Sequence, residues 1–173
     1  MFNVTPGMEQ AWLDLPKPKA TAADIALIEG SLGVKLPQPY VDFVTRYGFV
    51  AFGRDPEGRC MFWHVTEHAG QRQTREGDIS FLFRPAKLLQ VQRYMTSADS
   101  PADETRPSIP PGFLTIGSDA GQGAILLDVA AHPGWVYYWP ESDSRWGTGD
   151  NLALGFVAED FEEFINGLRS DRP

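Results

Sequence analysis

The chain has few of the residues that stabilise secreted proteins or hold metal ions. Its 173 residues include one cysteine, Cys60, and three histidines. A single cysteine excludes an intramolecular disulfide, which favours a reducing compartment. There is also no apolar run long enough to cross a bilayer, and no basic start followed by an apolar block. We therefore expect a cytoplasmic protein without a membrane span or a secretory signal.

A basic excess is missing as well. The formal net charge is −8, and the acidic excess lies in the C-terminal part. Residues 1–96 contain 11 basic and 10 acidic side chains, whereas residues 97–173 contain 4 and 13. Such a surface repels phosphate backbones, so direct nucleic-acid binding is not expected. It would attract a basic protein partner, although acidic charge also serves solubility alone.

What the sequence does contain is a pair of short helices between Thr21 and Gly48. Thr21 and Asp24 have nearly the spacing of a capping box, and Gly33 is suited to end the first helix. The Leu-Pro-Gln-Pro string at 36–39 prevents continuation, after which apolar residues return at helical spacing until Gly48. This stretch therefore predicts two packed helices that contain no catalytic or metal-binding residues.

The remaining segments predict strands and three further helical stretches. Residues 8–15 are expected to form a short helix or arm. A helix is expected at 85–96, and a last one begins after Asp160. Strands are expected at 49–53, 60–65, 80–83, 113–117, 124–128 and 135–139. Residues 66–78, 97–112 and 140–151 are polar and rich in turn-forming residues, so we expect loops there.

These segments together indicate an α+β fold. The connections between the last three strands are too short for parallel crossovers, so they indicate an antiparallel meander. We expect a central antiparallel sheet of about six strands, flanked by the N-terminal helical pair, a middle helix and a C-terminal helix. Residues 1–20 would form an N-terminal arm or short helix, and residues 21–170 a single domain.

Three strings carry residue types that are found in catalytic or metal sites. His64, Glu67 and His68 match the H-x-x-E-H pattern of inverted zinc peptidases, which requires a helix. The string starts in a β-rich segment, where the two imidazoles would lie about 13 Å apart. Cys60 has apolar neighbours, as structural cysteines do. The glycine-rich stretch at 117–123 lacks the Lys-Ser/Thr of a phosphate loop, so a hairpin turn is expected there.

The candidate binding residues lie in the acidic loops. The loop at 140–151 combines an aromatic side chain with carboxylates, which is typical of an ordinary solvated loop and also of an interface hot spot. The alternating residues Trp135, Tyr137 and Trp139 are more typical of a buried or half-buried sheet face. We expect no catalytic residues, no metal and no cofactor. The predicted partner contacts are Asp119, Glu141, Asp143, Trp146 and Asp150, with Asp103 and Glu104 in a flanking loop that we expect to be mobile.

A set of short sequence motifs occurs in a fixed order from residue 21 to about residue 168. The first are Ile28-Glu29, Leu32-Gly33, Leu36-Pro37, Tyr40, Phe43 and Tyr47-Gly48. The later ones are Ile116-Gly117, Asp119, Gly121, Asp128, Gly134-Trp135-Val136-Tyr137 and Phe161 to Phe164. In this order they resemble the SUKH superfamily of cell-wall-assembly regulators and immunity proteins.

The resemblance implies an α+β sheet wrapped by helices, without catalysis. Many bacterial members of that superfamily bind a cognate toxin domain, often a nuclease, and block it. We therefore expect an immunity protein that occludes the active site of a basic toxin domain. A regulatory interaction module without a toxin is the alternative, and a metal-dependent hydrolase using His64, Glu67 and His68 is the least favoured one. The sequence leaves the oligomeric state open.

Overall fold

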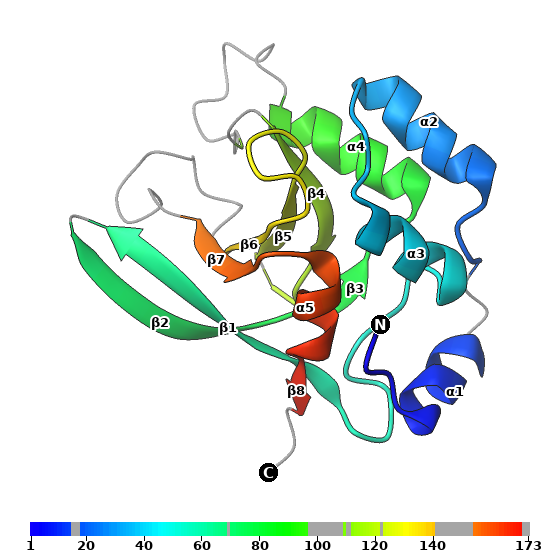
Figure 1. The fold of residues 1–173 in the computed structure, drawn as a ribbon, viewed down its shortest axis with the longest axis horizontal. Helices are drawn as coiled ribbons and strands as arrows, with labels where there is room; N and C mark the ends of the chain where they lie inside the picture. Colours follow the sequence, from blue (N-terminus) through cyan, green and yellow to red (C-terminus); the bar gives the residue numbers. More distant parts are fainter. Residues whose placement is uncertain are drawn as a thin grey trace.

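The computed structural model describes residues 1–14, 18–68, 70–96, 109, 112–121, 123–140 and 154–170 (Figure 1). Within these residues the helices are α1 (Pro6–Asp14), α2 (Ala22–Leu32), α3 (Gln38–Arg46), α4 (Pro85–Thr96) and α5 (Phe161–Asn166). The strands are β1 (Arg59–His68), β2 (Gln71–Asp78), β3 (Phe81–Leu82), β4 (Phe113–Ser118), β5 (Ala124–Asp128), β6 (Val136–Trp139), β7 (Gly155–Ala158) and β8 (Arg169–Ser170). The α+β class is therefore confirmed.

The strands form one antiparallel sheet in the order β2-β1-β7-β6-β5-β4-β3, and β8 pairs with β1. In the part of the chain that the structure describes, the sheet has eight strands instead of about six. The expected loop at 66–78 is wrong, because most of it forms β2, which pairs with β1 from Met61↔Asp78 to His68↔Gln71. The expected strand at 49–53 is reduced to one bridge, Ala51↔Phe81.

The helical pair has the predicted ends. The Thr21 hydroxyl accepts from the backbone N–H of Asp24 at 3.2 Å, and the Asp24 carboxylate accepts from the backbone N–H of Thr21 at 2.9 Å. This is the reciprocal capping box. Gly33 follows α2 with φ +66°, the left-handed conformation that closes a helix cheaply in glycine. The ends of α2 are thus fixed by its own local sequence.

The main hydrophobic core lies between one face of the sheet and the helices. Phe161 of α5 meets Tyr40 and Phe43 of α3 with ring centroids 5.2 and 5.4 Å apart. All five helices contribute side chains, and α1 supplies Met8 and Trp12, both almost fully buried. From the sheet the core takes Leu114, Ile116, Ile125, Leu127, Val136 and Tyr138. The helices therefore cover this face, and the other face carries a second, smaller core to which Met95 of α4 contributes.

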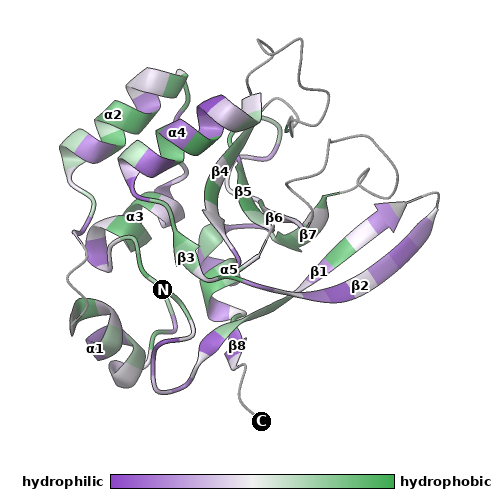
Figure 2. Ribbon diagram, turned by 180° about the vertical axis from the view of Figure 1, so that it is seen from behind, coloured by the Kyte–Doolittle hydropathy of each residue, from purple (hydrophilic) through white to green (hydrophobic). Residues whose placement is uncertain are grey.

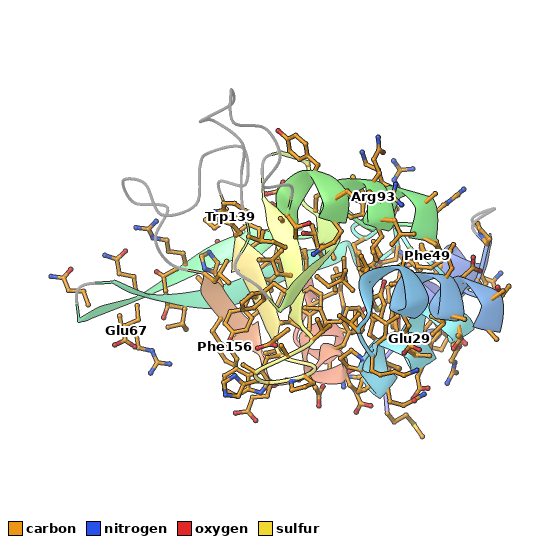
Figure 3. The ribbon with its side chains drawn as sticks, turned by 90° about the horizontal axis from the view of Figure 1, so that it is seen from above. Glu29, Phe49, Glu67, Arg93, Trp139 and Phe156 are labelled. Carbon is orange, nitrogen blue, oxygen red and sulfur yellow. The ribbon has the colours of Figure 1, made fainter. Side chains whose placement is uncertain are left out.

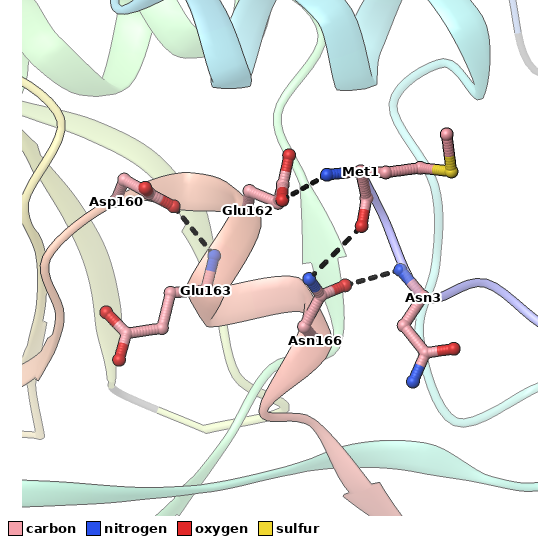
Figure 4. Close-up of polar contacts among 6 residues, drawn as sticks. All are labelled: Met1, Asn3, Asp160, Glu162, Glu163 and Asn166. Carbon is pink, nitrogen blue, oxygen red and sulfur yellow. Dashed lines mark hydrogen bonds and ion pairs between the residues drawn. The ribbon is translucent and has the colours of Figure 1, made fainter.

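Helix α5 begins after Asp160, as expected, and Asp160 is its N-cap (Figure 4). The Asp160 carboxylate accepts from the backbone N–H of Glu163 at 2.7 Å. The Glu163 carboxylate accepts at 2.8 Å from the N–H of Glu159, one residue before the cap. Both bonds satisfy N–H groups at the start of the helix, where negative charge is favoured.

The N-terminal residues are attached to the same helix (Figure 4). The Met1 amino group pairs with the Glu162 carboxylate. The backbone N–H of Asn3 donates to Oδ1 of Asn166 at 2.5 Å. These contacts join segments more than 160 residues apart in the sequence, at the exposed surface.

A side chain of α4 completes the edge of β4. Within β4, only Gly117 and Ser118 are paired with β3. Beyond it, Nε2 of the buried Gln92 donates to the carbonyl of Phe113 at 2.9 Å, and its Oε1 accepts from the N–H of Thr115 at 2.9 Å. The Gln92 amide thus provides the two hydrogen bonds that a neighbouring strand would make.

We expect the substitution Gln92→Leu to lower the free energy of unfolding by about 2–3 kcal/mol, because it leaves two strand groups buried without partners. Urea denaturation measures the change. Gln90→Leu is the matched control, since Gln90 is exposed on the same helix. Equal stability of the two variants would show that Gln92 does not support the edge.

Candidate protein-interaction site

Asp119 is the one predicted contact residue that the structure describes, and it is buried. Its Oδ1 accepts from the N–H groups of Gly121 and Gly123 at 2.7 and 2.9 Å, and its Oδ2 accepts from the Tyr138 hydroxyl at 2.6 Å. The glycine-rich stretch is thus the turn between β4 and β5, as predicted. Burial raises the pKa of Tyr138, and the hydrogen bond to Asp119 raises it further. A partner contact of Asp119 stays a prediction.

The other predicted contacts lie outside the described residues. They are Glu141, Asp143, Trp146 and Asp150 in the segment 141–153, and Asp103 and Glu104 in the segment 97–108.

The H-x-x-E-H string lies in β1, so it has strand geometry, as expected. His64 is buried and Glu67 is exposed, because residues three apart in a strand face opposite sides. The His64 ring lies 5.0 Å from the Tyr138 ring. Among the described residues, no group of three or more histidine, cysteine and acidic residues could hold a metal ion. Cys60, expected to be a buried structural residue, is half-buried against the main core.

His64 makes stability depend on pH in a defined direction. Burial and the nearby Arg75 lower its pKa below the ordinary 6.5, although a hydrogen bond to the backbone of Glu76 opposes this. As the pH falls through about 6.5, the unfolded chain takes up a proton at His64 before the folded chain does. The contribution of neutral His64 is therefore present above that pH and is lost in acid.

When the pH is lowered from about 7.5 to about 5.5, the free energy of unfolding is expected to fall less in His64→Phe than in the wild type. Denaturant titrations at both pH values measure it. His132→Phe serves as the control, because the His132 side chain is 54% exposed. The same pH dependence in wild type and His64→Phe would contradict the assignment.

The face of the sheet opposite the main core carries a connected set of half-buried aromatic rings. Phe113 of β4 lies 5.2 Å from Tyr137 of β6, and Tyr137 lies 5.7 Å from Phe156 of β7. Trp135, just before β6, lies 5.1 Å from Phe156, and His132 stacks on Trp135 at 4.2 Å. We call Phe113, Trp135, Tyr137 and Phe156 the aromatic array. Figure 3 shows Phe156 in the β-rich half of the molecule, away from Glu29 of α2.

The predicted sharing of one strand face by Trp135, Tyr137 and Trp139 is confirmed, but their burial differs. Trp139 is fully buried in a second, smaller core, whereas Trp135 and Tyr137 are half-buried. That core contains Met95, Ile109, Ala124, Leu126 and Trp139, and Phe113 and Tyr137 pack at its border. The aromatic array is thus supported from one side by packed residues.

Acidic groups border the aromatic array at its Trp135 end. The buried Asp128 carboxylate accepts from the N–H of His132 at 3.0 Å and lies 3.8 Å from the His132 ring nitrogen Nδ1. Burial raises the pKa of Tyr137, and the Asp128 charge raises it further. Gly134 lies close to the residues that precede α5: a Cβ atom added to it would be 3.9 Å from the carbonyl oxygen of Glu159 and 4.0 Å from the Cβ of Asp160. The turn before Trp135 therefore adjoins the acidic start of α5.

The acidic sequence segments connect directly to the strands of the array. Residues 97–111 lead through Gly112 into β4, which begins at Phe113, and residues 141–153 join the end of β6 to the start of β7. Each segment holds three acidic residues and one arginine. An aromatic surface with acidic surroundings can anchor a basic protein and accelerate its encounter.

A model of the SMI1 / KNR4 family (SUKH-1) matches residues 19–167, which span α2 to α5 and β1 to β7. The chain belongs to the SMI1/KNR4 family (SUKH-1). The resemblance to the SUKH superfamily, which was based on the ordered sequence motifs, is thereby confirmed. No curated protein matches the chain. The SUKH-1 domain has no helix in its described residues that is long and apolar enough to cross a membrane.

The sequence placed Trp135 and Tyr137 on one sheet face without predicting them as contact residues, and it did not indicate Phe113 or Phe156. β7 has only four residues, so its pattern is too short to reveal which face Phe156 occupies. The register Tyr137↔Phe156 decides this, and it joins two strands across the polar segment between them. Within the SUKH-1 match, the array is therefore the candidate site that the described residues support.

Proposed function

We propose that the chain is a bacterial immunity protein that binds a cognate toxin domain and occludes its active site. It would act by binding and without catalysis, in the cytoplasm. Membership of the SUKH-1 family supports a role in protein contact. The observation that carries the proposal is the aromatic array on the sheet face opposite the main core, bordered by acidic groups.

The partner favoured by this surface is a basic toxin domain. Half-buried aromatic rings give large contact areas at low entropic cost, and they dominate the energetics of many interfaces. The acidic excess in residues 97–173 adds long-range attraction for a positive surface. Toxins that cleave nucleic acids need such a surface, because their substrate is a polyanion. An acidic protein bound there would exclude the substrate.

The test uses the toxin domain encoded beside this gene. Tyr137→Ala is expected to weaken binding by about 10- to 100-fold in calorimetric titrations, as removal of a hot-spot aromatic does. Tyr94→Ala is the matched control, since Tyr94 is 48% exposed on α4 and lies outside the array. If the wild-type chain neither binds nor inhibits the adjacent toxin, the immunity role is wrong and the regulatory alternative takes its place.

The acidic contribution has a separate test. Reversing the charges of Glu141, Asp143 and Asp150 is expected to slow association about tenfold or more at low ionic strength, with a smaller effect at high salt. Stopped-flow mixing with the toxin measures the rate. Unchanged affinity and rate at low salt would remove the acidic segment from the mechanism and leave the aromatic array.

A further inference from the structure

The β1–β2 hairpin extends beyond the body of the sheet (Figure 1). β1 is paired with β7 only at Val65↔Phe156, whereas its pairing with β2 continues to His68↔Gln71. β2 is the last strand in the sheet order, so its second edge has no strand beside it among the described residues. Six consecutive residues, Gln71 to Glu76, are exposed. Figure 2 shows β2 as hydrophilic along this projecting arm.

A two-stranded ribbon with this exposure has little to stabilise it. Isolated hairpins are marginal in water, and stable sheets normally have a third strand or a packed face. On the open edge of β2, every second residue presents its N–H and C=O groups outward. Such an edge is a template for a further strand unless its charges repel every partner. The order of charges along β2 is therefore informative.

The sequence of β2 is complementary to itself. Arg72, Thr74 and Glu76 lie on one face, because they are paired with Glu67, Val65 and Trp63 of β1. We propose that β2 pairs antiparallel with β2 of a second copy of this chain, about a two-fold axis at Thr74. Arg72 then lies opposite Glu76 of the second copy, and the contact occurs twice. Moving the two-fold axis by one residue toward the hairpin tip, to Gln73, would place Arg72 opposite Thr74 of the second copy, and both Arg72–Glu76 contacts would be lost.

This pairing extends a charge pattern that the hairpin already has. Glu67 is directly opposite Arg72 within one copy, so the row across both copies would read Glu67, Arg72 and then Glu76 of the second copy. In the monomer, Glu76 pairs with Arg169 at 2.8 Å, and both side chains are at least 40% exposed. A solvated pair of this kind contributes little, and a carboxylate accepts from two guanidinium groups at once. The existing contact is therefore compatible with the proposed one.

Two single charge reversals test the register. Arg72→Glu and Glu76→Arg each replace two attractive contacts by two repulsive ones, so each variant is expected to dimerise at least about tenfold more weakly than wild type. An equimolar mixture of the two restores both attractions, and sedimentation should show a heterodimer. Arg75→Glu is the control, because it makes the same charge change on the other face of β2, opposite Gln73 of the second copy.

A cross-link gives an independent measurement. Thr74→Cys in a Cys60→Ser background is expected to form an intermolecular disulfide, since residue 74 lies opposite itself within disulfide range. A wild-type chain that stays monomeric at about 1 mM overturns the proposal. So does a mixture of the reversed variants that remains monomeric, or an Arg75→Glu variant weakened as much as Arg72→Glu. The immunity role does not depend on this outcome, because toxin binding is measured separately.

Discussion

Replacing Asp119 by alanine is expected to lower the free energy of unfolding by about 3–5 kcal/mol, one of the two largest effects that we expect for a single substitution in this chain. The carboxylate accepts from two backbone N–H groups and from the Tyr138 hydroxyl. Its removal leaves the Tyr138 hydroxyl and the Gly123 N–H buried without that partner. The β4–β5 turn and its attachment to β6 would weaken together.

The surroundings of Asp119 leave no room for an alternative arrangement. A Cβ at Gly123 would lie 2.1 Å from Oδ2 of Asp119 and 2.4 Å from the Tyr138 hydroxyl, so only glycine fits there. Asp78 is also near, and burial together with the Asp119 charge raises the pKa of its carboxyl group. Burying the Asp119 carboxylate close to Asp78 is therefore unfavourable, and its three hydrogen bonds offset this free-energy cost.

Guanidinium denaturation of Asp119→Ala and Tyr138→Phe separates the contributions. Tyr138→Phe removes one hydrogen bond and should cost only about 1–2 kcal/mol. If Asp119→Ala kept wild-type stability and yet lost affinity for the toxin, Asp119 would be a contact residue and would not be the residue that stabilises the turn.

The second large effect is expected for Trp12→Ala, at about 3–5 kcal/mol. Trp12 lies in α1, outside the residues matched by the family model, yet only 1% of it is exposed. Its ring makes edge contacts with Phe43, Tyr47 and Phe52 at centroid distances of 5.5 to 5.8 Å. Truncation would leave a cavity among aromatic rings that are themselves part of the main core.

The adjacent residue supplies the control for α1. Leu13 is 46% exposed, so Leu13→Ala should change stability by no more than about 0.5 kcal/mol. Trp12→Phe should recover much of the loss, because the indole Nε1 is buried and has no hydrogen-bond partner among the described residues. If Trp12→Ala cost no more than Leu13→Ala in urea denaturation, α1 would be a loosely attached arm.

Local sequence signals predicted those elements whose ends are fixed by their own residues. The Thr21 cap, Gly33 and Pro85 mark helix boundaries through backbone chemistry that does not depend on the rest of the fold. β2 escaped prediction because a strand exposed from Gln71 to Glu76 has no apolar alternation, and its pairing with β1 defines it instead. Hydrogen bonding, and not burial, makes it a strand.

The candidate site was less predictable for a related reason. Asp119 is an acidic residue in a turn, which in a sequence cannot be distinguished from a surface contact. Its burial depends on Tyr138, 19 residues away, which donates to it. The aromatic array likewise requires the registers of β4 to β7 before Phe113 and Phe156 lie on one face. Both features are tertiary, so composition and spacing alone do not reveal them.

The two ends of the strand order are neighbours in the chain. β2 ends at Asp78 and β3 begins at Phe81; between them the N–H of Ile79 donates to Cys60, and that of Ser80 donates to Ser118. Completing the sheet thus requires the β1–β2 hairpin and β4 to meet at this point, and such non-local contacts form more slowly than local ones. Until they meet, β3 has no partner strand, so this period is when the chain is most exposed to misassembly during its synthesis.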